Sequence, residues 1–190
     1  MTTPEKLQPR EIESIGNFAL DRAIEHLEKH WFDKGVGIVA ATIVDCDVTV
    51  SATSTFDPVS GRWFHAEYNA LMAYASEYAA LPTPRAVMGV TLSPCFLPST
   101  TRFGESCAHH LEETFLHRFV YGYLDEKQTP VAKIYQSRGL EAFYTPNQRQ
   151  RRICEELYQL FSLKTAYTID DPNPWNYLKR IMNFNPFDLK

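Results

Sequence analysis

The fold of this chain is decided by residues 86–95, which read AVMGVTLSPC. The first seven of these residues are mostly apolar and predict a short strand that is buried within a sheet. The Ser-Pro pair ends the strand, and Cys95 follows it at once. A second cysteine, Cys107, lies at the start of the next predicted helix, whose predicted N-cap is Ser106.

Helical and strand patterns alternate on both sides of this stretch. The predicted helices cover residues 11–30, 64–78, 106–117 and 148–161, and the predicted strands cover residues 36–44, 48–55, 86–92 and 119–124. Residues 56–63 are predicted to be a loop, and the pattern of residues 131–144 leaves helix and strand open. Strands that alternate with helices imply an α/β sandwich around a sheet whose later strands run parallel.

The composition is that of one globular domain. The chain has 190 residues, of which 44% are apolar, so it is long enough and apolar enough to build a core. Collagen-like, disordered and coiled-coil classes are excluded, and the net charge of −4 excludes a strongly basic nucleic-acid-binding protein. We predict a polar lead-in at residues 1–10, a folded domain at 11–168 and an irregular aromatic tail at 169–190.

No apolar run approaches the roughly 18 residues that are needed to cross a bilayer. Residues 1–10 also lack the apolar stretch of a secretory signal, so we expect a cytoplasmic protein without membrane contact, in a reducing compartment. None of the four cysteines belongs to a C-x-x-C pair, which excludes a zinc ribbon. Cys46 and Cys154 are predicted to be ordinary buried residues.

The candidate site combines one histidine with two cysteines. His65 and Glu67 open the second predicted helix, and Cys95 and Cys107 lie at the next strand-to-helix junction. One imidazole and two thiolates suit zinc, and three protein ligands leave a fourth position for water, as in catalytic zinc sites. Glu67 is close to His65 without being needed as a ligand, so it can carry protons.

The identity of the third metal ligand is open at this stage. His109 and His110 follow Cys107 closely in the sequence. Because residues 96–106 form an unusually long spacer between the cysteines, either histidine could replace Cys107 as a ligand.

The order His65-Ala66-Glu67, Pro94-Cys95, Cys107 resembles the zinc-dependent cytidine and deoxycytidylate deaminase superfamily. The resemblance implies a three-layer α/β/α cytidine deaminase-like fold with a central mixed sheet of about five strands. It implies Zn²⁺ bound by His65, Cys95 and Cys107, with Glu67 as the proton shuttle. It also suggests a homodimer or homotetramer.

The long spacer between the cysteines is similar to that of the riboflavin-pathway pyrimidine deaminases. The run from Val90 to Cys95 also looks like theirs. The chain departs from them at Phe96 and Leu97, where they carry a histidine, and at residues 33–35, where they carry Asn-Pro-Asn.

The resemblance implies a zinc-dependent hydrolytic deaminase. It would release ammonia from an amino-pyrimidine or amino-purine base, nucleoside or nucleotide. The backbone at Ala66 and Ser93 would contact this small-molecule substrate. Ser54 would contact it too, because it falls near the position of a ribose-binding asparagine in tRNA adenosine deaminases.

Two other functions are open. The chain could deaminate a base within RNA or single-stranded DNA, with a basic cluster of Arg149, Arg151, Arg152 and Lys164 near the phosphates, although a solvated helix face is the commoner role of such residues. It could also be a catalytically silent zinc-binding assembly subunit. The presence of Glu67 favours an active enzyme, because a silent relative does not need a proton shuttle.

Overall fold

The computed structural model describes residues 7–95, 106–114, 116–124, 131–166, 179 and 185–188. Most of the spacer between the two cysteines, including the departure at Phe96 and Leu97, lies outside the described residues, as does most of the predicted aromatic tail. Among the described residues, no helix has the length and apolar character that would let it cross a membrane.

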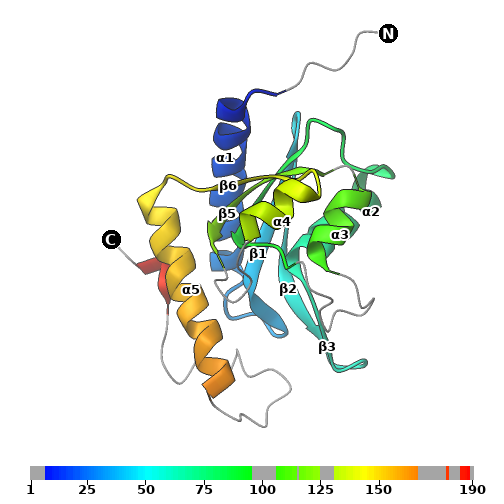
Figure 1. The fold of residues 1–190 in the computed structure, drawn as a ribbon. Coiled ribbons are helices and arrows are strands. Elements are labelled where there is room, and N and C mark those ends of the chain that lie inside the picture. Colours follow the sequence, from blue (N-terminus) through cyan, green and yellow to red (C-terminus); the bar gives the residue numbers. More distant parts are fainter. Residues whose placement is uncertain are drawn as a thin grey trace.

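Helices and strands alternate along the chain, as predicted (Figure 1). The elements are α1 (Pro9–Lys29), β1 (Val36–Asp45), β2 (Val48–Asp57), β3 (Arg62–Phe64), α2 (Ala66–Tyr78), β4 (Val87–Leu92), α3 (Cys107–Glu113), β5 (Arg118–Tyr123), α4 (Val131–Ser137), β6 (Glu141–Tyr144), α5 (Gln148–Ala166) and the short 3-10 helix η2 (Pro186–Asp188). The predicted helices and strands are all present. β3, which lies at the end of the predicted loop, and β6 were not predicted.

The described strands form a six-stranded mixed sheet in the order β3-β2-β1-β4-β5-β6, rather than one of about five strands. β1 pairs antiparallel with both β2 and β4, whereas β4, β5 and β6 are parallel to one another. This confirms that the later strands run parallel. The two unpredicted strands are the edge strands, and each is too short to show a period of its own in the sequence.

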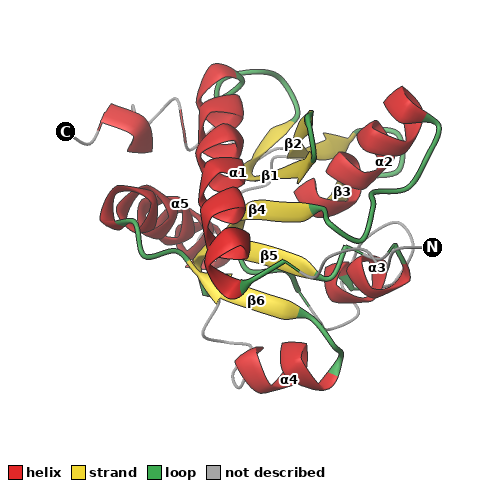
Figure 2. Cartoon of the chain, turned by 90° about the horizontal axis from the view of Figure 1, so that it is seen from above, coloured by secondary structure: helices red, strands yellow, loops and turns green. Residues whose placement is uncertain are grey.

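The sheet separates two apolar cores, which gives three layers. Figures 1 and 2 show α1 and α5 on one face and α2 and α3 on the other. Side chains of β5 show the alternation: Val120 packs with α1 and α5, whereas Phe119 and Tyr121 pack with α2 and α3. The three-layer α/β/α architecture is therefore confirmed.

Two glycines let the helices approach the sheet closely. A Cβ atom on Gly89 of β4 would lie 2.1 Å from the backbone nitrogen of Leu20 in α1. A Cβ atom on Gly122 of β5 would lie 2.2 Å from the Cys154 sulfur in α5. Larger residues at these positions would push the helices away from the sheet.

The cysteines outside the candidate site differ in environment. Cys154 is buried, as predicted. The prediction for Cys46 is wrong, because Cys46 is exposed in the turn between β1 and β2 and has a positive φ of 55°. The turn connects two strands at the surface, so its side chains have no core to enter.

The described part of the C-terminal segment packs on the domain. The Nζ atom of the fully buried Lys179 donates to the carbonyl oxygens of Trp31 at 2.7 Å, Val36 at 3.2 Å and Gly37 at 3.0 Å. The same nitrogen lies 3.9 Å from the centroid of the Trp31 ring, against which Phe187 packs edge-on. These contacts join the segment to the α1–β1 connection, while the predicted domain boundaries stay predictions.

Lys179 makes the stability of the protein depend on pH. Burial lowers the pKa of Lys179 to about 7, against the opposing effect of Asp33. Between about pH 7 and 10.5 the unfolded chain therefore binds more protons, and the free energy of unfolding rises with pH by at most about 1.4 kcal/mol per pH unit. In Lys179→Met this contribution is lost. The free energy of unfolding of the wild type minus that of the variant, measured by urea denaturation, should therefore be larger at pH 9 than at pH 7.

Lys133→Met is the matched control, because Lys133 is exposed on α4. Its difference from wild type should be the same at both pH values. A Lys179→Met difference that does not change with pH would contradict the prediction.

Candidate metal centre and active site

Three segments that are distant in sequence meet beyond the carboxyl end of β4. His65 is the N-cap of α2 and has an extended backbone, with φ −74° and ψ 149°, and its side chain does not cap the helix. Cys95 follows the end of β4, and Cys107 is the first residue of α3. Because His65 stands outside the helical turn, its side chain and that of Glu67 are not forced onto opposite sides of a helix.

The three candidate ligand atoms lie close to the spacing of a tetrahedral metal site. His65 Nδ1 lies 3.0 Å from Cys107 Sγ and 3.7 Å from Cys95 Sγ, and the two sulfur atoms are 3.5 Å apart. Zinc with Zn–S bonds of about 2.3 Å and Zn–N bonds of about 2.0 Å separates its ligand atoms by roughly 3.5–3.8 Å. These residues therefore fit a zinc ion once His65 Nδ1 and Cys107 Sγ move about 0.5 Å further apart.

Backbone N–H groups of α3 support the two sulfur atoms. The Cys107 N–H donates to Cys95 Sγ at 3.3 Å, and the Ala108 N–H donates to the Cys95 carbonyl at 2.9 Å. As predicted, Ser106 caps α3, and its hydroxyl accepts a bond from the His109 N–H at 3.2 Å. The strand end and the helix start are thus fixed relative to each other.

These contacts favour a thiolate at Cys95. Hydrogen bonding from Cys107 lowers the pKa of Cys95 to about 4 despite burial, and His65 adds to this effect. The same hydrogen bond and burial raise the pKa of Cys107 well above its ordinary value. Burial alone would lower the pKa of His65, but its hydrogen bond with Cys95 and the charge of Glu67 outweigh burial and raise it. A thiolate is the form that a metal ion binds.

Glu67 is a buried carboxyl group beside the candidate ligands. Its side chain belongs to the second residue of α2 and is only 4% exposed. Burial raises the pKa of Glu67, although the neighbouring His65 and a hydrogen bond with the Cys107 thiol act in the opposite direction. A carboxyl group with a raised pKa is suited to accept and return a proton near neutral pH.

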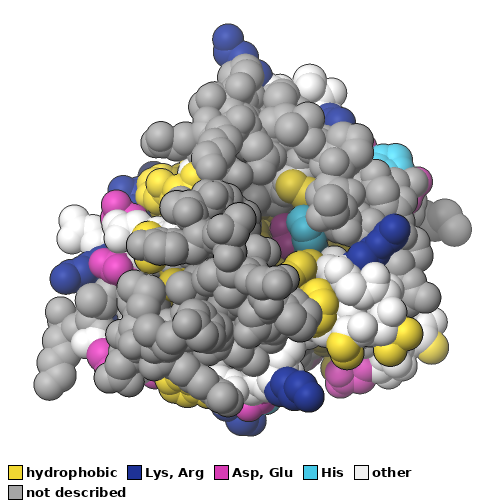
Figure 3. Space-filling view, turned by 90° about the horizontal axis from the view of Figure 1, so that it is seen from below, with side chains coloured by type: hydrophobic (Ala, Val, Ile, Leu, Met, Phe, Trp, Pro, Cys, Tyr) yellow, Lys and Arg dark blue, Asp and Glu magenta, His cyan; other side chains and the backbone are white. Residues whose placement is uncertain are grey.

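Figure 3 shows the end of the molecule at which these segments meet. A histidine and an acidic side chain are visible side by side near the centre of this face. The carboxyl ends of parallel strands are the usual position of ligand sites in α/β sheets.

The predicted substrate-contacting residues lie at the same end of the central strands. Ala66 is the fully buried first residue of α2, and Ser93 is a buried residue whose N–H donates to the Tyr123 carbonyl at 2.8 Å. Ser54 is 8% exposed, and its Oγ accepts a bond from the Val39 N–H at 3.3 Å. Their roles in substrate binding stay predictions.

The structure brings Cys107, rather than His109 or His110, into the group of candidate ligands. The His109 ring faces the carboxylates of Glu112 at 3.8 Å and Glu113 at 3.4 Å. The His110 ring packs against Tyr68 of α2, with ring centroids 5.3 Å apart. Neither ring belongs to the group of candidate ligands among the described residues.

The predicted basic cluster on α5 is partly used by the fold. The Arg151 Nε donates to the Thr145 carbonyl at 2.5 Å, and the Arg151 guanidinium lies 4.3 Å from the centroid of the Tyr144 ring. The Lys164 side chain lies outside the described residues. Arg151 therefore supports the β6–α5 connection and is not simply a surface charge.

Two residues that support the site were not predicted from the sequence. The Asn69 amide, one turn beyond His65, donates to the Thr53 carbonyl at 2.8 Å and to Thr55 Oγ1 at 3.0 Å. The Tyr135 hydroxyl donates to the Pro94 carbonyl, directly before Cys95. A polar residue four positions after His65 was a weak signal for Asn69, whereas nothing local signalled Tyr135.

Comparison with known proteins agrees with this geometry. Residues 15–123 match the family model described as the cytidine and deoxycytidylate deaminase zinc-binding region. This range includes His65, Cys95 and Cys107. No curated protein sequence matches the chain.

The solved structures that are similar to the chain include two deaminases. One is the diaminohydroxyphosphoribosylaminopyrimidine deaminase/5-amino-6-(5-phosphoribosylamino)uracil reductase of Thermotoga maritima, with 22% identity and a TM-score of 0.56 over 80% of this chain. This chain covers only 42% of that protein. The other is a deaminase of A-to-I editing at the wobble position of transfer RNA, with 18% identity and a TM-score of 0.43 over 67% of this chain and 94% of that chain. The first likeness confirms the fold.

Metal content gives a direct test of the ligand set. The purified protein should contain about one zinc ion per chain. Cys95→Ser should lose this zinc on dialysis, because a hydroxyl does not ionise to replace a thiolate ligand. Elemental analysis measures both values.

Cys46→Ser is the matched control, since Cys46 is exposed at the opposite end of β1. It should keep its zinc. A folded wild-type protein without zinc, or a Cys95→Ser variant that keeps zinc, would contradict the assignment.

Proposed function

Because this chain belongs to the cytidine and deoxycytidylate deaminase family, we propose that it is a zinc-dependent hydrolase that releases ammonia from an amino-substituted pyrimidine or purine ring. The observation that carries the proposal is the meeting of His65, Cys95 and Cys107 beside the buried carboxyl group of Glu67. This arrangement combines a candidate metal centre with a proton carrier.

His65, Cys95 and Cys107 would hold the zinc. A bound zinc ion would supply a Lewis acid and a water molecule of lowered pKa. In the overall reaction, water adds to the amine-bearing ring carbon, the carbon–nitrogen bond breaks, and a carbonyl group and ammonia are formed.

Glu67 would move the protons that this reaction requires. Its carboxylate would take one proton from the attacking water and deliver it to a ring nitrogen. It would then take the second proton from the hydroxyl group formed on the ring carbon and deliver it to the departing amine. Burial supports this role because it raises the pKa of the carboxyl group toward neutral pH.

The substrate would be a free base, nucleoside or nucleotide. The backbone at Ala66, between His65 and Glu67, and at Ser93, two residues before Cys95, would contact the ring, and Ser54 would contact the sugar. The net charge of −4 and the engagement of Arg151 within the fold favour a small molecule over a polynucleotide. By resemblance to its family, the enzyme would assemble as a homodimer or homotetramer.

A silent assembly subunit is the less favoured function. Such a subunit would need the three ligands but not a buried carboxylic acid next to them, and burying an ionisable group is costly. Glu67 is both present and buried.

An ammonia-release screen tests the proposal. It would cover free bases, nucleosides, nucleotides and aminopyrimidine phosphates, and at least one of these compounds should be turned over. Glu67→Gln keeps the side-chain shape but cannot carry the proton, so the rate should fall by at least about 100-fold while zinc is retained.

Glu77→Gln is the control, because Glu77 is exposed near the other end of the same helix. It should turn over the same compound at the wild-type rate. A Glu67→Gln variant that keeps its activity would contradict the role of Glu67 as the proton carrier. A zinc-loaded wild type that releases no ammonia from any compound would favour the silent assembly subunit.

A further inference from the structure

The turn that carries Cys95 has little secondary structure of its own. β4 ends at Leu92, and the turn is attached on one side by the Ser93 N–H bond to Tyr123 and on the other by the Ala108 N–H bond to the Cys95 carbonyl. Between these attachments lies Pro94, which has no N–H and can be held only through its carbonyl oxygen.

Tyr135 of α4 supplies a donor to that carbonyl. Its side chain is 1% exposed, and its hydroxyl donates to the Pro94 oxygen. Burial raises the pKa of this phenol, although the Ser93 side chain acts in the opposite direction, so the hydroxyl keeps its proton and stays a donor. The donor is thus permanent at any physiological pH.

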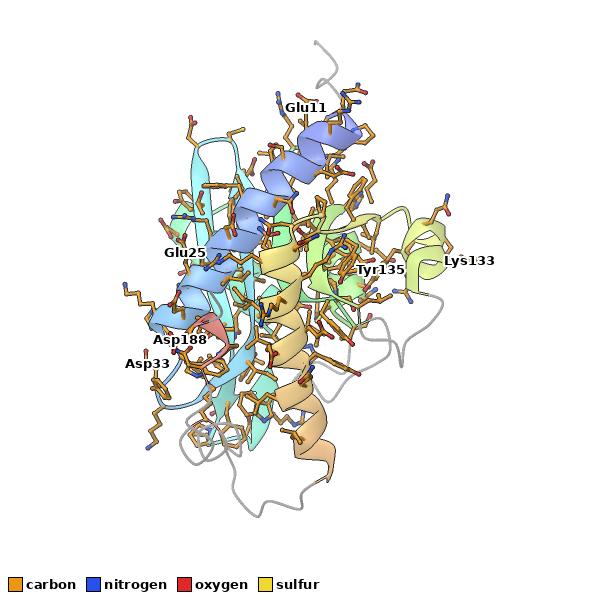
Figure 4. The ribbon with its side chains drawn as sticks, turned by 90° about the vertical axis from the view of Figure 1, so that its left-hand side faces the viewer. Glu11, Glu25, Asp33, Lys133, Tyr135 and Asp188 are labelled. Carbon is orange, nitrogen blue, oxygen red and sulfur yellow. The ribbon has the colours of Figure 1, made fainter. Side chains whose placement is uncertain are left out.

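The Tyr135 ring is itself fixed in place. It packs edge-on against Phe119 of β5, with centroids 4.9 Å apart and an interplanar angle of 89°. The Tyr135 carbonyl accepts a bond from the Leu140 N–H at 2.9 Å, which ties α4 to the start of β6. Figure 4 shows Tyr135 on the side of α4 that faces the domain, with Lys133 on the outer side.

We propose that Tyr135 is a positioning residue for the metal centre, whose hydroxyl fixes the Ser93–Cys95 turn so that Cys95 Sγ meets His65 Nδ1 and Cys107 Sγ in metal-binding geometry. The family match ends at residue 123, so this support comes from the part of the chain beyond the matched region. The inference rests on the proposed zinc-dependent function. It assigns a purpose to α4 and β6, which contribute no candidate ligand.

Tyr135→Phe removes the hydroxyl and keeps the ring that packs on Phe119. Its zinc dissociation constant, measured by competition with a chromophoric chelator, should be about tenfold weaker than that of wild type, as for other groups that orient metal ligands. The Co²⁺-substituted variant should show an altered thiolate-to-metal charge-transfer absorption, because Cys95 is less well placed. The far-UV circular dichroism of the metal-free variant should match wild type.

Tyr74→Phe is the matched control. The Tyr74 hydroxyl donates to Asp45 Oδ2 at 2.9 Å, and Asp45 ends β1 at the opposite edge of the sheet. This variant should be less stable to heat, yet bind zinc with wild-type affinity and give a wild-type Co²⁺ spectrum. Tyr135→Met, in which a flexible apolar side chain fills the space, tests the same bond if Tyr135→Phe does not fold.

The outcomes separate this inference from the proposed function. Wild-type zinc affinity and an unchanged Co²⁺ spectrum in the folded Tyr135 variant would overturn the positioning role. A wild-type protein that binds no zinc in the same titration would instead overturn the proposed function on which the inference rests.

Discussion

The parallel pairing of β4 with β5 is the constraint on which the rest of this structure depends. Parallel neighbours cannot be joined by a hairpin, so the chain must leave the carboxyl end of β4 and cross over before it enters β5. α3 lies on this crossover, and its first residue is Cys107. Residues 96–106 separate Cys95 and Cys107 in the sequence, yet the crossover leaves their sulfur atoms 3.5 Å apart.

The same geometry decides the electrostatics of the site. The N–H of Cys107 points at the Cys95 sulfur, and His65 stands at the N-cap of the neighbouring α2. A thiolate, an imidazole and the Glu67 carboxyl group are therefore enclosed together, where each shifts the pKa of the others. Such mutual shifts are typical of active sites, and here they arise from two helix starts that face one strand end.

The part of the chain beyond the family match supports this centre from outside. α4 brings the Tyr135 hydroxyl to the turn before Cys95, and β6 holds α4 by pairing with β5. On the opposite face, α5 packs so closely that a Cβ atom on Gly122 would lie 2.2 Å from the Cys154 sulfur. The buried Lys179 also joins the C-terminal segment to the α1–β1 connection, so elements beyond the matched region pack on both faces of the sheet.

The sequence by itself determined the α/β class and the candidate site residues His65, Glu67, Cys95 and Cys107, because helix and strand periods and the strand-to-helix junctions are local signals. It did not determine β3 and β6, which are too short to carry a period and are strands only because a neighbouring strand pairs with them. The choice of Cys107 over His109 and His110 depended on the position of the first residue of α3 beside Cys95. The supporting roles of Tyr135 and Lys179 were decided by the tertiary structure alone. Each side chain donates to backbone carbonyl groups that are distant in sequence, and every residue type has such a carbonyl, so the sequence pattern does not indicate the partner.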